Sequence, residues 1–273
     1  MTRERLDLLR GRLMDEARRA ACDPVHPVPH DLALILDRAL EAASARADLC
    51  LASCAAAEWA GGEPEEGLPG AVAALLMDAA LMCHLTLPGF SLELPVEALW
   101  PEHGEASAIL AGDALLPAAF GYLASNCGLH SARLAAAASS LFSRGILPGF
   151  SAELALRDRK SDLAERENAW RLHAGGLARF ASEAGAVLAG AGADDVDRAA
   201  MTGLTLGRAF DLAFMPGCPS RQGSTKSQRE KEAQSMLAEL RESLSGNPRA
   251  GLFLAIMDGI GSSPGGGDLF ARG

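Results

Sequence analysis

Apolar residues recur at helical spacing along most of this chain. Near the start, Leu6, Leu9 and Leu13 lie three or four positions apart. This spacing places them on one face of a helix and predicts an amphipathic helix over Thr2–Ala21. Three prolines between Asp23 and His30 end that pattern, because proline cannot continue an α-helix.

The middle of the chain contains the most apolar stretch. Residues Ala71–Leu87 are apolar almost throughout, which predicts a helix that is buried on every side. Loops rich in proline and glycine flank it at Gly61–Gly70 and Pro88–Glu102. A second long helix is expected at Glu105–Ser125, with a kink at Pro117, which has no backbone N–H to donate.

The remaining segments also favour helices, and we expect a turn at the sequence RGILPG, Arg144–Gly149. Because no repeat or long linker divides the chain, we expect one all-α bundle of roughly ten helices over residues 1–260. A glycine-rich tail would follow at 261–273. Further helices are expected at 31–40, 46–59, Leu129–Ser143, 161–188 with a bend or close packing at Gly175-Gly176, from the N-cap Asp194 or Asp195 to near Met215, Ser227–Leu244 and Pro248–Gly259.

Composition and charge limit which partners and which cellular location we expect for the protein. Hydrophobic residues make up 49% of the chain and the formal net charge is -10. Without a basic cluster, nucleic acid is not an expected partner. The apolar run Gly70–Leu87 contains Asp78 and His84, so we expect a core helix and no membrane span. The start of the chain is charged, which predicts no signal peptide. The use of the cysteines, with no CxxC pair, predicts a reducing, cytoplasmic location.

None of the six cysteines forms a CxxC pair, and no histidine cluster accompanies them. Cys50 and Cys54 lie four positions apart, which places both on one face of a helix. We interpret them as a buried pair of small apolar side chains, in preference to a redox or metal site.

Five segments of this chain are similar, in order and spacing, to the trans-prenyl diphosphate synthases, the family of farnesyl and geranylgeranyl diphosphate synthases. The segment GEASAILAGDALL is the closest of the five. The resemblance implies an isoprenoid synthase-type bundle around a central cavity. It also implies two DDxxD motifs whose aspartates hold Mg²⁺ against a diphosphate. The five segments are Leu49–Gly62, Leu81–Pro88, Gly104–Leu116, Gly176–Ala193 and Thr205–Phe214.

The positions that the resemblance assigns to the metal-binding aspartates are not acidic. Leu, Thr, Phe and Met offer no carboxylate to a hard cation. We therefore expect no Mg²⁺, no other metal and no cofactor. The first motif falls at Leu85, Thr86 and Ser91, and the second at Phe214, Met215 and Cys218.

Other functional positions of the family are also changed. Of the basic GGKRxRP loop only Arg46 remains, as a candidate residual diphosphate contact. The isopentenyl-binding histidine becomes Asp78, the lysine of the KT pair becomes His173, and the glutamine before the second motif becomes Asp211. Together with His84, the last three are the candidates for an altered acid/base site. The alternative is that each is a hydrogen-bonded polar residue of the bundle.

Three functions remain open. The first is a non-catalytic or regulatory protein of isoprenoid metabolism, in a homodimer or in a heterodimer with an active prenyl diphosphate synthase. Plant small subunits of this kind carry a CxxxC element, and Cys50–Cys54 has that form. The second is an enzyme with a magnesium-independent reaction on an isoprenoid, and the third is a carrier of an isoprenoid or other apolar ligand.

Overall fold

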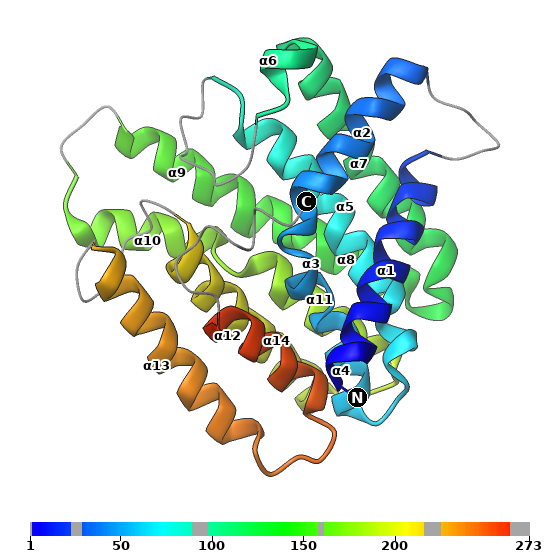
Figure 1. Ribbon diagram of the computed structural model, residues 1–273, viewed down its shortest axis with the longest axis vertical. Coiled ribbons are helices and arrows are strands. Elements are labelled where there is room, and N and C mark those ends of the chain that lie inside the picture. The colour runs from blue at the N-terminus through cyan, green and yellow to red at the C-terminus, as the bar shows by residue number, and fades with distance from the viewer. Residues whose placement is uncertain (1, 23–28, 89–97, 158–160, 216–224, 263–273) are drawn as a thin grey trace.

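The computed structural model describes residues 2–22, 29–88, 98–157, 161–215 and 225–262 (Figure 1). These described residues form helices and no strand, so the all-α prediction is confirmed. The helices are α1 (Thr2–Ala21), α2 (His30–Ser44), α3 (Ala47–Cys50), α4 (Ala52–Ala60), η1 (Pro64–Gly67), α5 (Leu68–Leu85), α6 (Trp100–His103), α7 (Glu105–Asn126), η2 (Gly128–His130), α8 (Ser131–Leu141), η3 (Phe142–Ile146), α9 (Leu147–Arg157), α10 (Leu163–His173), α11 (Gly176–Leu188), α12 (Ala193–Phe214), α13 (Lys226–Leu244) and α14 (Gly251–Ser262).

Helix α5 lies at the centre of the bundle, as its uniformly apolar sequence predicted. It packs against α1, α2, α7 and α11, and all of its residues except Pro69 and His84 are buried. Its one acidic residue, Asp78, is therefore buried as well. A helix enclosed in this way brings any charge that it carries into the core, where the charge needs a partner.

Helix α11 packs closely against α4 and α12 because glycines stand at the contacts. A Cβ atom on Gly185 would lie 1.8 Å from the carbonyl oxygen of Ser53 on α4. On Gly203 of α12 it would lie 2.2 Å from the carbonyl oxygen of Ala178. Only glycine lets these backbones approach so closely.

The predicted turn at Arg144–Gly149 is wrong. The chain continues there as the π-helix η3 and then as α9. Pro148 is the second residue of α9, directly after the π-helix. Proline and glycine therefore lie within a continuous helical segment here, although in the sequence they indicated a break.

Two smaller predictions have different outcomes. The expected bend at Gly175-Gly176 is present: α10 ends at His173, and Gly175 has a φ of 74° before α11 begins. The expected N-cap at Asp194 or Asp195 is wrong, because Gly192 occupies that position and both aspartates lie in the first turn of α12. There their negative charges still interact favourably with the positive end of the helix dipole.

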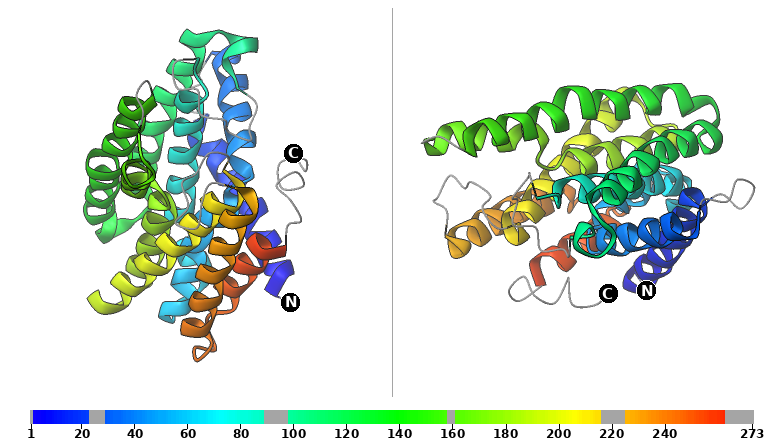
Figure 2. Two further views of the ribbon diagram at one scale, coloured as in Figure 1. Left: turned by 90° about the vertical axis from the view of Figure 1, so that its left-hand side faces the viewer. Right: turned by 90° about the horizontal axis from the view of Figure 1, so that it is seen from above.

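Helices α7, α8 and α9 lie along one side of the bundle (Figure 2). Among the described residues, two helical segments are long and apolar enough to cross a membrane by length and composition: Pro64–Leu85, 89% buried inside the protein, and α7, only 33% buried. The absence of a membrane span remains a prediction. Of the predicted tail, 263–273 lies outside the described residues, and α14 extends to Ser262.

Candidate functional site

Three charged side chains meet in the interior, and we call them the Arg46 cluster: Arg46, Asp78 and Asp211. The Nε atom of Arg46 lies 3.3 Å from Oδ2 of Asp78, and its Nη1 atom lies 3.8 Å from Oδ1 of Asp211. The Arg46 side chain is only 15% exposed. One guanidinium therefore joins a carboxylate of α5 to a carboxylate of α12, the two helices to which the resemblance assigned the aspartate motifs.

The local chain geometry places Arg46 in this position. Helix α2 ends at Ser44, and Arg46 is the N-cap residue of α3, with φ −106° and ψ 7°. The break between α2 and α3 leaves room for its long side chain to extend into the core. There it also lies over the ring of Phe210, with Cζ 5.7 Å from the ring centroid. This cation–π contact gives the guanidinium a further favourable neighbour.

The two carboxylates differ in their surroundings. Asp78 is 1% exposed, and neither of its oxygens accepts a hydrogen bond from a residue that the structure describes. Asp211 accepts one from the backbone N–H of Gly175, at 3.3 Å. The ion pair between Arg46 and Asp78 is close, but its angles are not those of a hydrogen bond. Asp78 is thus the less well compensated of the two.

Burial dominates the titration of both groups. It raises the pKa of Asp78, an effect that Arg46 partly opposes and Asp211 reinforces. Burial also raises the pKa of Asp211, while Arg46, His173 and the N–H of Gly175 act in the opposite direction. In each case the cost of removing a carboxylate from water exceeds the gain from the shared guanidinium.

His173 extends this group of charges. It is the last residue of α10, its Nε2 atom lies 3.0 Å from Oε1 of Glu153 on α9, and its ring stacks on Phe150 with centroids 4.3 Å apart. A positive charge on its ring would lower the pKa of Asp211. The structure therefore brings together four of the residues named from the sequence: Arg46, Asp78, His173 and Asp211.

Two residues near this cluster, Glu153 and Phe210, could not be inferred from the sequence. Glu153 lies just beyond the segment that was predicted to be a turn, so nothing linked it to His173. Phe210 looked like one more apolar residue of a helix. Only the packing of α9 against α10, and of Arg46 over α12, reveals their roles.

His84 lies apart from this cluster. Its Nε2 atom is 3.4 Å from Oδ1 of Asp113 and 3.3 Å from the carbonyl oxygen of Ile109, both on α7. A Cβ atom on Gly112 would come within 2.3 Å of the same nitrogen. His84 thus fastens the end of α5 to α7, which favours the structural interpretation of this residue.

The described positions that align with the aspartate motifs either belong to the apolar core or form a hydrogen bond within their own helix turn. Leu85 and Phe214 belong to the buried core, at 5% and 7% exposure. Thr86 donates its hydroxyl to the carbonyl oxygen of Met82, and Met215 packs against the core. Ser91 and Cys218 lie outside the described residues.

These residues do not fit a magnesium ion. Mg²⁺ requires several oxygen ligands, usually from carboxylates and water. No group of three His, Cys, Asp or Glu side chains in the described part of the chain could hold a metal ion. The nearby carboxylates, Asp78 and Asp211, are instead turned toward Arg46. No reaction step that requires the metal can be derived from this arrangement.

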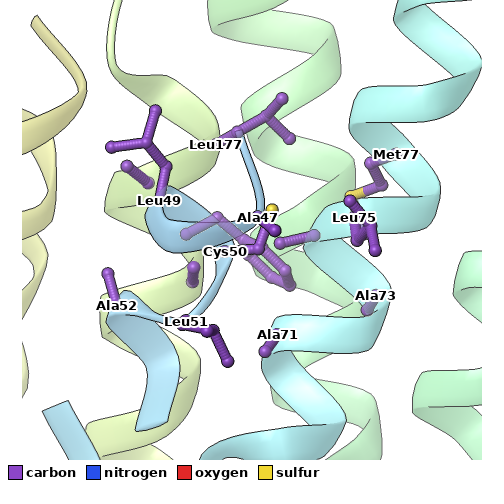
Figure 3. Close-up of a cluster of buried hydrophobic side chains, with 14 of the residues drawn as sticks. Ala47, Leu49, Cys50, Leu51, Ala52, Ala71, Ala73, Leu75, Met77 and Leu177 are labelled. Carbon is purple, nitrogen blue, oxygen red and sulfur yellow. The ribbon is translucent and has the colours of Figure 1, made fainter. Parts of the chain in front are cut away.

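Cys50 and Cys54 are buried, as predicted. Cys50 lies in α3 among the apolar side chains between α3 and α5, with Leu75 and Met77 nearby (Figure 3). Burial raises the pKa of the Cys54 thiol to about 12 and that of Cys50 well above its usual value. Both are therefore protonated and unreactive at neutral pH.

Comparison with known proteins identifies the fold. A curated geranylgeranyl diphosphate synthase from Cyanophora paradoxa is 34% identical to this chain over 173 residues, which cover 60% of the chain and 57% of that relative. The chain thus spans little more than half the length of the curated relative that it matches. No family model matches the chain.

Solved structures agree with this similarity over nearly the whole chain. A farnesyl/geranylfarnesyl diphosphate synthase from Zymomonas mobilis superposes with a TM-score of 0.71 and 21% identity, covering 93% of this chain and 99% of that one. The geranyl diphosphate synthase small subunit from Antirrhinum majus gives 0.69 and 22%, covering 92% and 98%. The chain has the isoprenoid synthase fold, and its predicted resemblance to the trans-prenyl diphosphate synthases is confirmed.

Proposed function

We propose that this prenyl synthase-like chain does not transfer prenyl groups by itself and acts as the non-catalytic partner of an active prenyl diphosphate synthase. The observation that carries the proposal is the Arg46 cluster. The one basic residue retained from the diphosphate-binding loop is held inside the protein by Asp78 and Asp211. It is therefore not available to a substrate diphosphate in this arrangement.

The loss of carboxylates supports the same proposal. Ionisation of an allylic diphosphate places negative charge on the leaving group, which metal ions must stabilise. Removing a single well-placed electrostatic group raises a barrier by about 3 kcal/mol. Here Leu85 and Phe214 have become core residues, and no metal ligand set replaces them in the described residues.

The outward face of α7 supplies the second support. Ile109 and Leu110 are 41% and 61% exposed, although they belong to a long apolar helix. Neighbouring exposed apolar residues on one helix are a feature of protein interfaces. By analogy with the family, α7 would lie near the dimer interface. The Antirrhinum majus protein with this fold is itself named as a small subunit.

The test is co-expression with an active geranylgeranyl diphosphate synthase from the same cell. We expect a stable complex by size-exclusion chromatography and a change in the chain length of its products. The chain alone should give no product from isopentenyl and allylic diphosphates with Mg²⁺. Prenyl transfer by the isolated chain, or no association with any active synthase, would contradict the proposal.

Two matched variants locate the interface. Leu110 on α7 and Leu8 on α1 are almost equally exposed, at 61% and 62%, but lie on different helices. We expect Leu110→Asp to abolish the complex and Leu8→Asp to leave it intact, because a charge is costly only where the surface becomes buried. Equal effects of the two substitutions would count against α7. A homodimer that competes with the mixed complex would identify a second copy as the occupant.

A second candidate function is a magnesium-independent acid/base reaction on an isoprenoid. The observation that favours it is the burial of Asp78, whose pKa is raised and whose oxygens accept no hydrogen bond from a described residue. A carboxylic acid in such surroundings is a proton donor. Turnover that survives a chelator and is lost in Asp78→Asn, but not in His84→Ala, would support this function. His84 serves as the control because it lies on the α7 side of α5.

A further inference from the structure

The Arg46 cluster has an unequal number of opposite charges. Among the residues that the structure describes, two carboxylates, Asp78 and Asp211, share the Arg46 guanidinium. The neighbouring pair of His173 and Glu153 adds at most one positive charge against one negative charge. If every acid were ionised, the group would retain a net negative charge inside the protein. Such a charge is costly in a medium of low dielectric constant, and a buried carboxylate avoids the cost by taking up a proton.

We propose that Asp78 and Asp211 together hold one proton at neutral pH, so that the Arg46 cluster is a buried proton-binding site. The proton neutralises the second carboxylate, and the guanidinium neutralises the first. Two such groups titrate as a coupled pair, and the proton belongs to the pair as a whole. The inference does not depend on whether the chain has a catalytic partner.

The surroundings indicate which oxygen carries the proton. Asp211 receives a hydrogen bond from the N–H of Gly175 and lies within the influence of His173, and both favour its ionised form. Asp78 has neither of these, and it faces Arg46 and the negative charge of Asp211. The thiol of Cys50 on α3 also lies near Asp78, but burial keeps it protonated. The proton therefore resides mainly on Asp78.

Infrared spectroscopy of the full chain tests the inference. A protonated carboxyl group has a carbonyl band that ionised carboxylates lack, and ¹³C-labelled aspartate shifts that band. We expect the wild-type protein at pH 7 to show one such carboxyl group per chain. We expect the band to be lost in Asp78→Asn and equally in Asp211→Asn, because either amide leaves one carboxylate for one guanidinium.

The expected loss of the band in Asp211→Asn distinguishes a proton shared by the two carboxylates from a proton on one isolated acid. If Asp78 were protonated independently of its neighbour, Asp211→Asn would leave the band unchanged, and the inference would be overturned. A wild-type spectrum without the band at pH 7 would overturn it as well. Asp113→Asn, at an exposed carboxylate paired with His84, is the control and should change nothing.

A stability measurement covers the case in which a variant does not fold. A proton held only by the folded chain makes the unfolding equilibrium constant rise with pH, by up to about tenfold per pH unit. We expect this rise in wild type above the ordinary carboxyl range, and a smaller rise in whichever of the two amide variants folds. Identical slopes in wild type and variants would overturn the inference.

Discussion

The Nε atom of Arg46 lies 3.3 Å from Oδ2 of Asp78, which is buried, while the Arg46 side chain is half-buried. The resemblance to the trans-prenyl diphosphate synthases implies a diphosphate contact at Arg46. Here Arg46 forms an ion pair with Asp78 of the same chain, and Asp211 is the second carboxylate beside its guanidinium. An internal ion pair therefore stands where the resemblance implies a ligand.

Removing the guanidinium should destabilise the protein strongly. Arg46→Met leaves two buried carboxylates without their counter-ion, and breaking a buried pair in this way typically costs about 3–5 kcal/mol. We expect a loss of that order at pH 8, measured by denaturant unfolding. Arg18→Met is the control, because Arg18 pairs with Asp37 at the surface and should contribute less than about 1 kcal/mol.

The loss in Arg46→Met should also depend on pH. Burial raises the pKa of Asp78 and Asp211 in the folded protein, and removing Arg46 removes an influence that lowers it. Unfolded carboxyl groups titrate near about 4, so the folded variant binds more protons than the unfolded chain above that pH. Its stability is therefore greatest in acid and falls as the pH rises. Equal losses at pH 5 and pH 8 would contradict this account.

The close packing of α11 against α4 predicts how glycine substitutions change the free energy of unfolding. A Cβ atom on Gly185 would lie 1.8 Å from a backbone oxygen of α4, which cannot move without shifting that helix. We expect Gly185→Ala to lower the free energy of unfolding by about 1–3 kcal/mol. Gly121→Ala on α7 meets no atom within 4 Å and should raise it by about 1 kcal/mol, because alanine favours a helix. The same denaturant series measures both variants.

Magnesium and inorganic diphosphate together should not stabilise this chain. Anything that binds only the folded state raises the unfolding temperature, and a ligand at a hundred times its Kd contributes about 2.7 kcal/mol. With Leu85 and Phe214 in the core and Arg46 engaged by two carboxylates, we expect no shift in thermal unfolding. An active synthase measured alongside should show a clear rise. A saturable rise for this chain would show that a metal–diphosphate site remains.

The buried thiols should be unreactive in the native protein. Burial raises the pKa of Cys54 and of Cys83 to about 12 and leaves little thiolate at pH 8. We expect mass spectrometry after iodoacetamide treatment to find Cys50, Cys54 and Cys83 unmodified, with half-buried Cys22 modified first. All four should react in guanidinium chloride. Native modification of Cys50 or Cys54 would show that the CxxxC element is accessible.

The amino-acid sequence by itself determined the helices and the order in which they occur. The bounds of α1 were predicted to the residue, and α5 was expected to be the buried central helix, because periodicity and uniform apolarity record which faces avoid water. The sequence also established that no DDxxD segment is present. It did not give the π-helix at Phe142–Ile146, because proline and glycine indicate a break and carry no information about a wider helical turn.

The tertiary structure alone decided what the remaining polar residues do. Arg46, Asp78, His173 and Asp211 were all candidates from the sequence, yet nothing in their spacing showed that the arginine would lie between two of the acids. His84, an equally plausible candidate, instead pairs with Asp113 across α5 and α7. Charges interact according to distance in space and to their burial, and both depend on how the helices pack, which no local pattern in the chain records.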